Sequence, residues 1–294
     1  MYNWGVGVER SYTSALRWYR LGAESGDTIC LRNIGYFYEK GQAVPQSYEE
    51  AIEWYKRASD NGDGWSASQI GLLYEKGLGV EKSCETAAKW FERGAEMGYV
   101  WAQSKMGFAY EHGTGVPKSP EQAAKWYHMS ASQGHAISEY KIGQCYERGI
   151  GVPRILVEAL RWYRSSAEHG SATGQRLLAE MYEFGKGVEK SYETAAEWHA
   201  KAAEQGDQWS QMHLAELYYR GRGVERSYEE AARLYALSAE QGNAFSQFSL
   251  GYMYEKGIGV EASMERAMEL YRSAAKQGDK NAIAALERLE GPVT

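Results

Sequence analysis

One short motif recurs along the whole chain at a constant interval. The string Gly-X-Gly-Val, with alanine once replacing its second glycine, is repeated with successive copies 36 residues apart. A strict period between about 20 and 50 residues indicates a solenoid, a propeller or another array of small structural units. The period therefore constrains the fold more than any other feature of the chain. The copies begin at Gly5, Gly41, Gly77, Gly113, Gly149, Gly185, Gly221 and Gly257.

The same motif has some likeness to a phosphate-binding loop. A dinucleotide fingerprint, however, needs a preceding strand and a third glycine, and neither is present here. Eight copies are also more than a nucleotide site needs. We therefore predict that these glycines adopt the left-handed backbone that ends one helix and turns the chain toward the next. Ala43 indicates that the second glycine position accepts a side chain.

Each repeat predicts two helices when it is numbered from its first glycine. Position 7 is serine, a helix N-cap, in every copy except the one with Ile155, where we expect the weakest cap. Ser47 with Glu50, and Ser227 with its own glutamate, have the spacing of a capping box. Small and aromatic residues recur at positions 11, 15, 18 and 19, which share one helical face and predict the first helix. Glycine at position 22 marks the C-terminal end of that helix. A second helix follows over positions 24 to 36, and its glycine at position 31 predicts close packing of a neighbouring helix.

Composition and charge exclude several classes of function. The net charge is −6 and no basic block is present, so we expect no nucleic-acid partner. No apolar run approaches the roughly 18 residues of a membrane span, so we expect no membrane insertion. Three widely spaced cysteines make neither a disulfide framework nor a zinc ribbon. The first ten residues have no apolar signal region, but this leaves the compartment open: cytoplasmic as given, or periplasmic or secreted if a signal peptide was removed.

The chain offers few candidates for chemistry. Its six histidines occupy six different repeat positions, so no metal-ligand spacing recurs, and His128, His135 and Cys145 are the nearest approach to a zinc set. Paired glutamates such as Glu49 and Glu50 fall in a first helical turn, where they favour the helix dipole. A glycosidase pair is the alternative, and it would need to converge in a cleft. We expect no catalytic, cofactor-binding or metal-binding residues, and therefore no enzyme.

The repeat resembles the Sel-1-like repeat family. Residues 70–80 read IGLLYEKGLGV and residues 51–62 read AIEWYKRASDNG. The family signature is similar: L-G-x-x-Y-x-x-G-x-G-V, then a cap, then A-x-x-W-Y-x-x-A-A-x-x-G. The resemblance covers essentially the whole chain and implies an all-α fold, a right-handed α-solenoid of about eight 36-residue helix-turn-helix repeats related to tetratricopeptide repeats. One subgroup ties each repeat with a cysteine pair, which this chain lacks.

The two ends of the repeat array differ. We expect residues 1–294 to form a single solenoid. Met1 and Tyr2 align with positions 33 and 34, so the helix before Gly5 is expected to be truncated, leaving an open repeat through which the chain could self-associate. Near the other end, Glu287 and Glu290 stand where glycine and tyrosine belong, which predicts a polar capping helix over about residues 280–290.

Function is expected where the copies differ on a shared face. On the second helix, positions 25, 28, 29 and 32 lie opposite the apolar face, and the tetratricopeptide-like arrangement implies that they line the concave side. They are rich in the residue types that anchor protein interfaces. In the alternative interpretation, the large side chains at position 25 only seal the groove between repeats. The predicted protein-binding residues are Arg32, Tyr36, Trp65, Leu72, Trp101, Phe108, Tyr140, Arg176, Glu180, Trp209, Met212, Glu216, Phe245, Phe248 and Tyr252.

These observations predict a non-enzymatic scaffold or adaptor that holds a protein or peptide partner on this face. The family resemblance implies a bacterial source and one alternative, an immunity protein that neutralises a secreted bacterial toxin. The truncated first helix leaves a second alternative, the regulatory arm of a larger protein whose N-terminal part is missing. Loss of binding on removal of the aromatic face, without unfolding, distinguishes a binding module from an enzyme.

Overall fold

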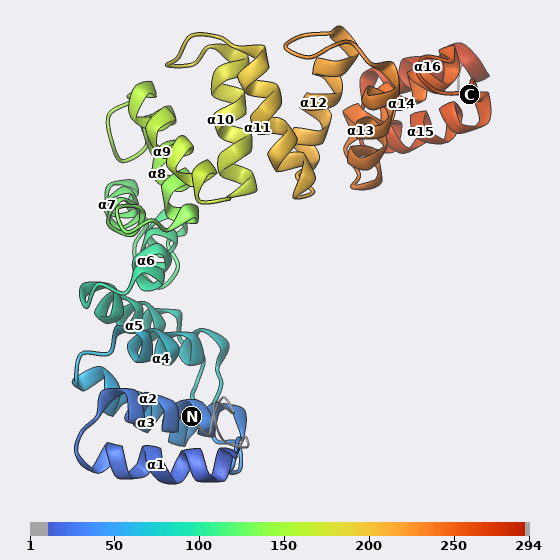
Figure 1. The fold of residues 1–294 in the computed structure, drawn as a ribbon. Coiled ribbons are helices and arrows are strands. Elements are labelled where there is room, and N and C mark those ends of the chain that lie inside the picture. The colour runs from blue at the N-terminus through green and yellow to red at the C-terminus, as the bar shows by residue number, and fades with distance from the viewer. Residues whose placement is uncertain (1–10, 292–294) are drawn as a thin grey trace. The chain divides into compact units, whose positions relative to one another are not determined.

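The computed structural model describes residues 11–291, and this part of the chain is an all-α solenoid of stacked helical hairpins (Figure 1). It divides into two compact units, 1–154 and 155–294, each described by itself. The described part of the first unit holds α1 (Tyr12–Glu24), α2 (Thr28–Lys40), α3 (Tyr48–Asp60), α4 (Gly64–Lys76), α5 (Cys84–Glu96), α6 (Val100–His112), α7 (Pro120–Ala131) and α8 (Ala136–Arg148). The second unit holds α9 (Leu156–Glu168), α10 (Ala172–Phe184), α11 (Tyr192–Glu204), α12 (Gln208–Arg220), α13 (Tyr228–Glu240), α14 (Ala244–Lys256), α15 (Met264–Lys276) and α16 (Lys280–Glu290).

The serine caps form as predicted, but the capping boxes do not close. The Ser47 hydroxyl accepts from the backbone N–H of Glu50 at 3.2 Å. The backbone N–H of Ser47 donates instead to the Tyr38 carbonyl at 3.0 Å, so the second half of the predicted box is wrong. The backbone N–H of Ser227 likewise donates to the Tyr218 carbonyl, in the preceding second helix α12. Ile155 gives α9 no side-chain cap, which confirms the weak cap expected there.

The loop glycines end the second helices, as predicted. Gly77 has φ 71° and caps α4, with its N–H donating to the Leu73 carbonyl. Ala43 adopts φ 62° and is the one non-glycine residue with positive φ among residues 11–291. A left-handed backbone is uncommon for alanine, so this position accepts a side chain only in a strained conformation.

The glycine at position 31 lets an aromatic ring of the next repeat pack directly on the second helix. A Cβ atom at Gly35 would lie 2.6 Å from ring carbons of Tyr55, so a side chain there would force the ring to shift. The Tyr55 ring is fully buried, and its hydroxyl donates to Glu39 at 2.8 Å. This confirms the predicted close packing and places the Tyr55 ring, at repeat position 15, in the core with its hydroxyl as a polar tip. An aromatic ring of the next repeat packs equally closely on three other glycines: Phe91 on Gly71, Tyr127 on Gly107 and Tyr271 on Gly251.

The ends of the chain bear on two further expectations. The helix expected to be truncated at Met1 and Tyr2 lies outside the described residues. At the other end, α16 packs through Ala282 and Ala285 against α15. Over residues 11–291, none of the helices is both long and apolar enough to cross a membrane.

Candidate functional site

The predicted binding residues lie on the even-numbered, second helices of both units. We call the residues at positions 25, 28, 29 and 32 of these helices the second-helix surface. Four predicted aromatic residues on it are between 39% and 49% exposed: Phe108 in the first unit, and Trp209, Phe245 and Tyr252 in the second. The other predicted residues are half-buried: Arg32, Tyr36, Trp65, Leu72, Trp101, Tyr140, Arg176, Glu180, Met212, Glu216 and Phe248.

Trp65 and Trp101 are held by packing within the first unit. The Trp65 ring lies edge-on to Tyr55 with 5.6 Å between ring centroids, and the Arg32 guanidinium lies over it at 5.5 Å. Trp101 makes an equivalent edge contact with Phe91 at 5.9 Å. These contacts favour the groove-sealing interpretation for both tryptophans.

A polar triad lies between helices of the first unit and lines a groove. Glu111 at the end of α6 accepts from the Tyr127 hydroxyl of α7 at 2.5 Å and from the Lys141 ammonium of α8 at 3.0 Å. Burial alone raises the pKa of Glu111, but these two hydrogen bonds and the Lys141 charge outweigh it, so its pKa is lowered. The three side chains, with Gln144 and Cys145 among others, line a pocket of about 190 Å³.

The second unit has a pocket at the equivalent repeat position, and it unites several predicted residues. Tyr219 stands where other repeats have glutamate, so the Tyr235 hydroxyl donates to Glu216 instead, at 2.7 Å. Together with Phe248 and Tyr252, these side chains line a pocket of about 220 Å³. The structure thus brings together three residues of the predicted set, two of them aromatic.

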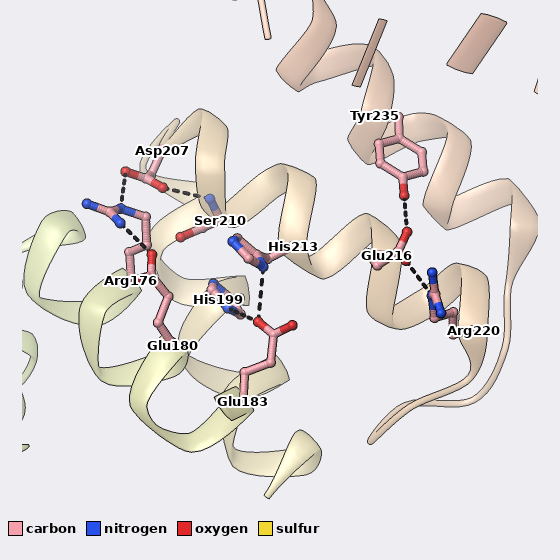
Figure 2. Close-up of polar contacts among 10 residues, drawn as sticks. All are labelled: Arg176, Glu180, Glu183, His199, Asp207, Ser210, His213, Glu216, Arg220 and Tyr235. Carbon is pink, nitrogen blue, oxygen red and sulfur yellow. Dashed lines mark hydrogen bonds and ion pairs between the residues drawn. The ribbon is translucent and has the colours of Figure 1, made fainter. Parts of the chain in front are cut away.

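The charged residues predicted in the second unit are already paired within the chain (Figure 2). The Arg176 guanidinium contacts the carboxylates of Glu180 at 2.5 Å and of Asp207 at 3.6 Å. Glu216 pairs with Arg220 one helical turn later. These residues therefore present hydrogen-bonding groups rather than unpaired charge.

The structure also gathers three residues that the sequence analysis did not group, which we call the His–Glu cluster: Glu183, His199 and His213. Figure 2 shows both imidazole rings directed at the Glu183 carboxylate, from α11 and α12. The Oε2 atom of Glu183 lies 3.2 Å from Nε2 of His199 and 3.0 Å from Nδ1 of His213. The two rings stack in parallel, with centroids 5.0 Å apart and planes inclined by 3°.

Burial and hydrogen bonding set the protonation of this cluster. Burial alone raises the pKa of Glu183, but the hydrogen bonds from His199 and His213 lower it to about 2. His199 is fully buried, and this burial lowers its pKa below the ordinary histidine value. At neutral pH the cluster therefore holds an ionised carboxylate and a neutral His199 imidazole.

The cluster was missed because its residues occupy three different repeat positions. His199 stands at position 15 in place of the usual aromatic residue, His213 at position 29, and Glu183 at position 35 of the preceding repeat. Comparing the same positions across repeats would have found it, since Tyr127 and Lys141 occupy the two histidine positions two repeats earlier in the chain. Among the described residues, this is the one grouping of three or more potential ligands, and His128, His135 and Cys145 do not converge.

A family model described as Sel1 repeat matches the chain in eight segments. They cover residues 1–27, 28–63, 66–99, 102–135, 136–171, 172–207, 210–243 and 244–279. Among proteins with curated descriptions, none matches the chain.

Two solved structures are similar over nearly the whole chain. A protective antigen present in uropathogenic Escherichia coli strains, which displays an SLR fold, is 36% identical with a TM-score of 0.92. The match covers 98% of this chain, which spans only 62% of that protein. A Sel1 repeat protein from Oxalobacter formigenes is 30% identical with a TM-score of 0.74, and the match covers 93% of this chain and 79% of that one.

Proposed function

The chain belongs to the Sel1 repeat family, and we propose that it is a non-enzymatic scaffold that binds an extended polypeptide along its second-helix surface. The repeat architecture supports a protein-interaction role, because stacked hairpins present equivalent surfaces at regular intervals. In this proposal the second-helix surface is the concave side of each unit. The partner is a protein or peptide segment rather than a small molecule.

The observation that carries the proposal is the combination of exposed aromatic side chains with grooves at equivalent repeat positions. In the second unit, Phe245 and Tyr252 are 43% and 39% exposed on α14, and Tyr252 borders a pocket with Glu216 and Phe248. In the first unit, Phe108 is 47% exposed and borders a groove between α5 and α6. Exposed aromatic residues beside pockets are typical anchors of protein interfaces. In the first unit, the grooves beside Phe108 and beside Tyr127 lie one repeat apart, a spacing that suits an extended chain with side chains at intervals.

The thiols of Cys30 and Cys145 in the first unit support a non-catalytic role. Cys145 lines the pocket beside Glu111, but burial raises the pKa of its thiol to about 11. Burial likewise raises the pKa of Cys30 to about 11. Thiols with such pKa values stay protonated at neutral pH and are poor nucleophiles.

Selection of peptides from a phage-displayed library of random dodecapeptides tests the proposal. We expect the chain to enrich peptides that carry spaced apolar side chains. Enriched peptides should bind at least ten-fold more weakly to the variant Phe245→Ala/Tyr252→Ala, measured by fluorescence anisotropy. Both side chains are exposed, so the variant is expected to keep the helicity of the parent, which circular dichroism checks.

Met264→Ala is the matched control, because Met264 is 49% exposed but begins the first helix α15, away from the second-helix surface. It should leave peptide affinity unchanged. Failure to enrich any peptide, or an equal loss of affinity in the control and the aromatic variant, would contradict the proposal.

A further inference from the structure

We propose that Glu183, His199 and His213 bind a divalent transition-metal ion of the zinc class. Imidazole nitrogens and carboxylate oxygens are ordinary ligands of this class of ion. The proposal concerns the His–Glu cluster alone and stands whether or not the second-helix surface binds a polypeptide.

The geometry of the cluster is close to that of a metal site. In a tetrahedral zinc site with bonds of about 2.1 Å, neighbouring ligand atoms lie about 3.4 Å apart. The Glu183 Oε2 atom is already 3.2 Å and 3.0 Å from the two histidine nitrogens. All three ligand atoms lie within 4.8 Å of one another. A metal ion therefore requires only a small separation of side chains that the fold already directs at one point.

The buried histidine ring is held in one orientation. The Nδ1 atom of His199 is buried and has no hydrogen-bond partner among the described residues. The contact at Nε2 is therefore the one that orients this ring, whether Nε2 carries a proton shared with Glu183 or coordinates an ion. The second histidine ring stacks on it and restricts its rotation.

Comparison with other repeats shows that pairing the glutamate does not require two histidines. Glu39 is paired by the Tyr55 hydroxyl, and Glu111 by Tyr127 and Lys141. Tyrosine and lysine satisfy the carboxylate by hydrogen bonding and charge. In the His–Glu cluster both partner positions carry histidine at once, which replaces hydrogen-bond donors by metal-binding nitrogens.

The cluster is also open enough to take up an ion. The side chains of His213 and Glu183 are 20% and 11% exposed, whereas His199 forms its buried floor. Three protein ligands with an exposed side leave a fourth tetrahedral position for water or for a group from another molecule.

Titration of the untagged chain with CoCl₂ and ZnCl₂ tests the proposal. We expect one equivalent of Co²⁺ to give the visible absorption bands of a tetrahedral complex, and Zn²⁺ to displace it. Isothermal titration calorimetry gives the Zn²⁺ affinity. Loss of an outer-shell partner typically weakens metal sites 10–100-fold, so loss of a ligand is expected to weaken binding by at least about 100-fold.

His213→Lys is the informative variant, because it recreates the lysine–glutamate pair that Lys141 makes with Glu111. It should fold with unchanged helicity and lose the cobalt bands. Glu183→Gln keeps the shape of the side chain and should weaken Zn²⁺ binding as well. The opposite change, Tyr127→His/Lys141→His, should add a second equivalent of bound Co²⁺ at Glu111.

Two results would overturn the proposal. One is the absence of Co²⁺ and Zn²⁺ binding by the unmodified chain. The other is binding that keeps the same stoichiometry and affinity in a folded His213→Lys variant, since this would place the ion elsewhere.

Discussion

Two sites in this molecule, one in each unit and two repeats apart in the sequence, share one backbone plan and differ in their chemistry. In the first unit, Glu111 is held by Tyr127 and Lys141. In the second unit, the equivalent positions carry Glu183, His199 and His213, with the same two contacts to one carboxylate. The solenoid thus keeps a glutamate at a fixed place while its two partners change from structural donors to metal-binding nitrogens.

This difference shows how a repeat protein acquires a site without altering its fold. The glutamate position is set by the end of one second helix, and its partners by the next hairpin. Because each hairpin contacts mainly its neighbours, two substitutions change one site and leave the rest of the stack intact. Exceptions to the repeat columns are therefore the informative positions.

The largest expected effect comes from removing the aromatic ring of Tyr127 in the first unit. Tyr127 is 2% exposed, so Tyr127→Ala should lower the free energy of unfolding by about 3–5 kcal/mol. His199→Ala, measured in EDTA, should cost less because the imidazole ring is smaller. Chemical denaturation followed by circular dichroism measures both changes.

Tyr127→Phe is the control for the ring, since Phe91 occupies the same repeat position naturally. It removes the hydroxyl and leaves Lys141 to pair Glu111, so we expect a loss of about 1 kcal/mol. Equal losses in the free energy of unfolding for Tyr127→Ala and His199→Ala would mean that packing of the two side chains contributes equally to stability.

The next effect is a difference in metal response between the two sites. Zn²⁺ at 100 times its dissociation constant should stabilise the unmodified chain by about 2.7 kcal/mol, because the ion binds only the folded cluster. Thermal unfolding with and without EDTA measures the shift. His213→Lys converts the second site to the chemistry of the first and should abolish the response. A shift of equal size in that variant would show that the metal response does not depend on His213.

The repeat positions that carry the same residue type in each copy made the fold predictable. The His–Glu cluster depends on positions where that residue type changes, so it was not predicted. Invariant glycines and small residues correctly predicted the helix ends and the close approach of Gly35 to Tyr55. The His–Glu cluster was not expected, because its members come from two hairpins and only three-dimensional packing unites them. The closed capping box was also mispredicted at Ser47, whose backbone N–H is satisfied by Tyr38 of the preceding helix. Local spacing cannot anticipate such a contact between helices.

The second-helix surface was predictable in part. The pattern located an aromatic-rich face, and Phe108, Trp209, Phe245 and Tyr252 are exposed there. It did not separate these residues from Trp65 and Trp101, which pack on rings of the first helices. Side-chain exposure depends on the ring opposite, and this is a property of the folded hairpin rather than of one position.

A third member of the glutamate column extends the comparison to acid. Glu255 is held by Arg288, Lys256 and Tyr271, and although burial alone raises its pKa, these partners lower it to about 2. An unfolded glutamate titrates near pH 4.3. Since the folded pKa is depressed, its stabilising contribution is complete above about pH 4.3 and is lost as the pH falls toward 2.

Glu255→Gln should therefore flatten the dependence of stability on pH between about 4.3 and 2. Denaturant midpoints measured at several pH values give this slope. Arg288→Gln should produce part of the same effect, because it removes one of the partners of the carboxylate. A slope that neither variant changes would show that Glu255 does not contribute to acid sensitivity.

The smallest expected effect concerns the helix caps of the two units. The first unit caps α7 with Ser119, whereas Ile155 leaves the start of α9 without a side-chain cap. Ile155 is 43% exposed, so its replacement loses little burial. Ile155→Ser should stabilise the chain by about 1 kcal/mol, and Ser119→Ala should destabilise it by a similar amount. Matching denaturation curves would show that the caps are equivalent. A loss of stability in Ile155→Ser would instead mean that the isoleucine packs at the start of α9, and that the break in the serine column is a contact rather than a missing cap.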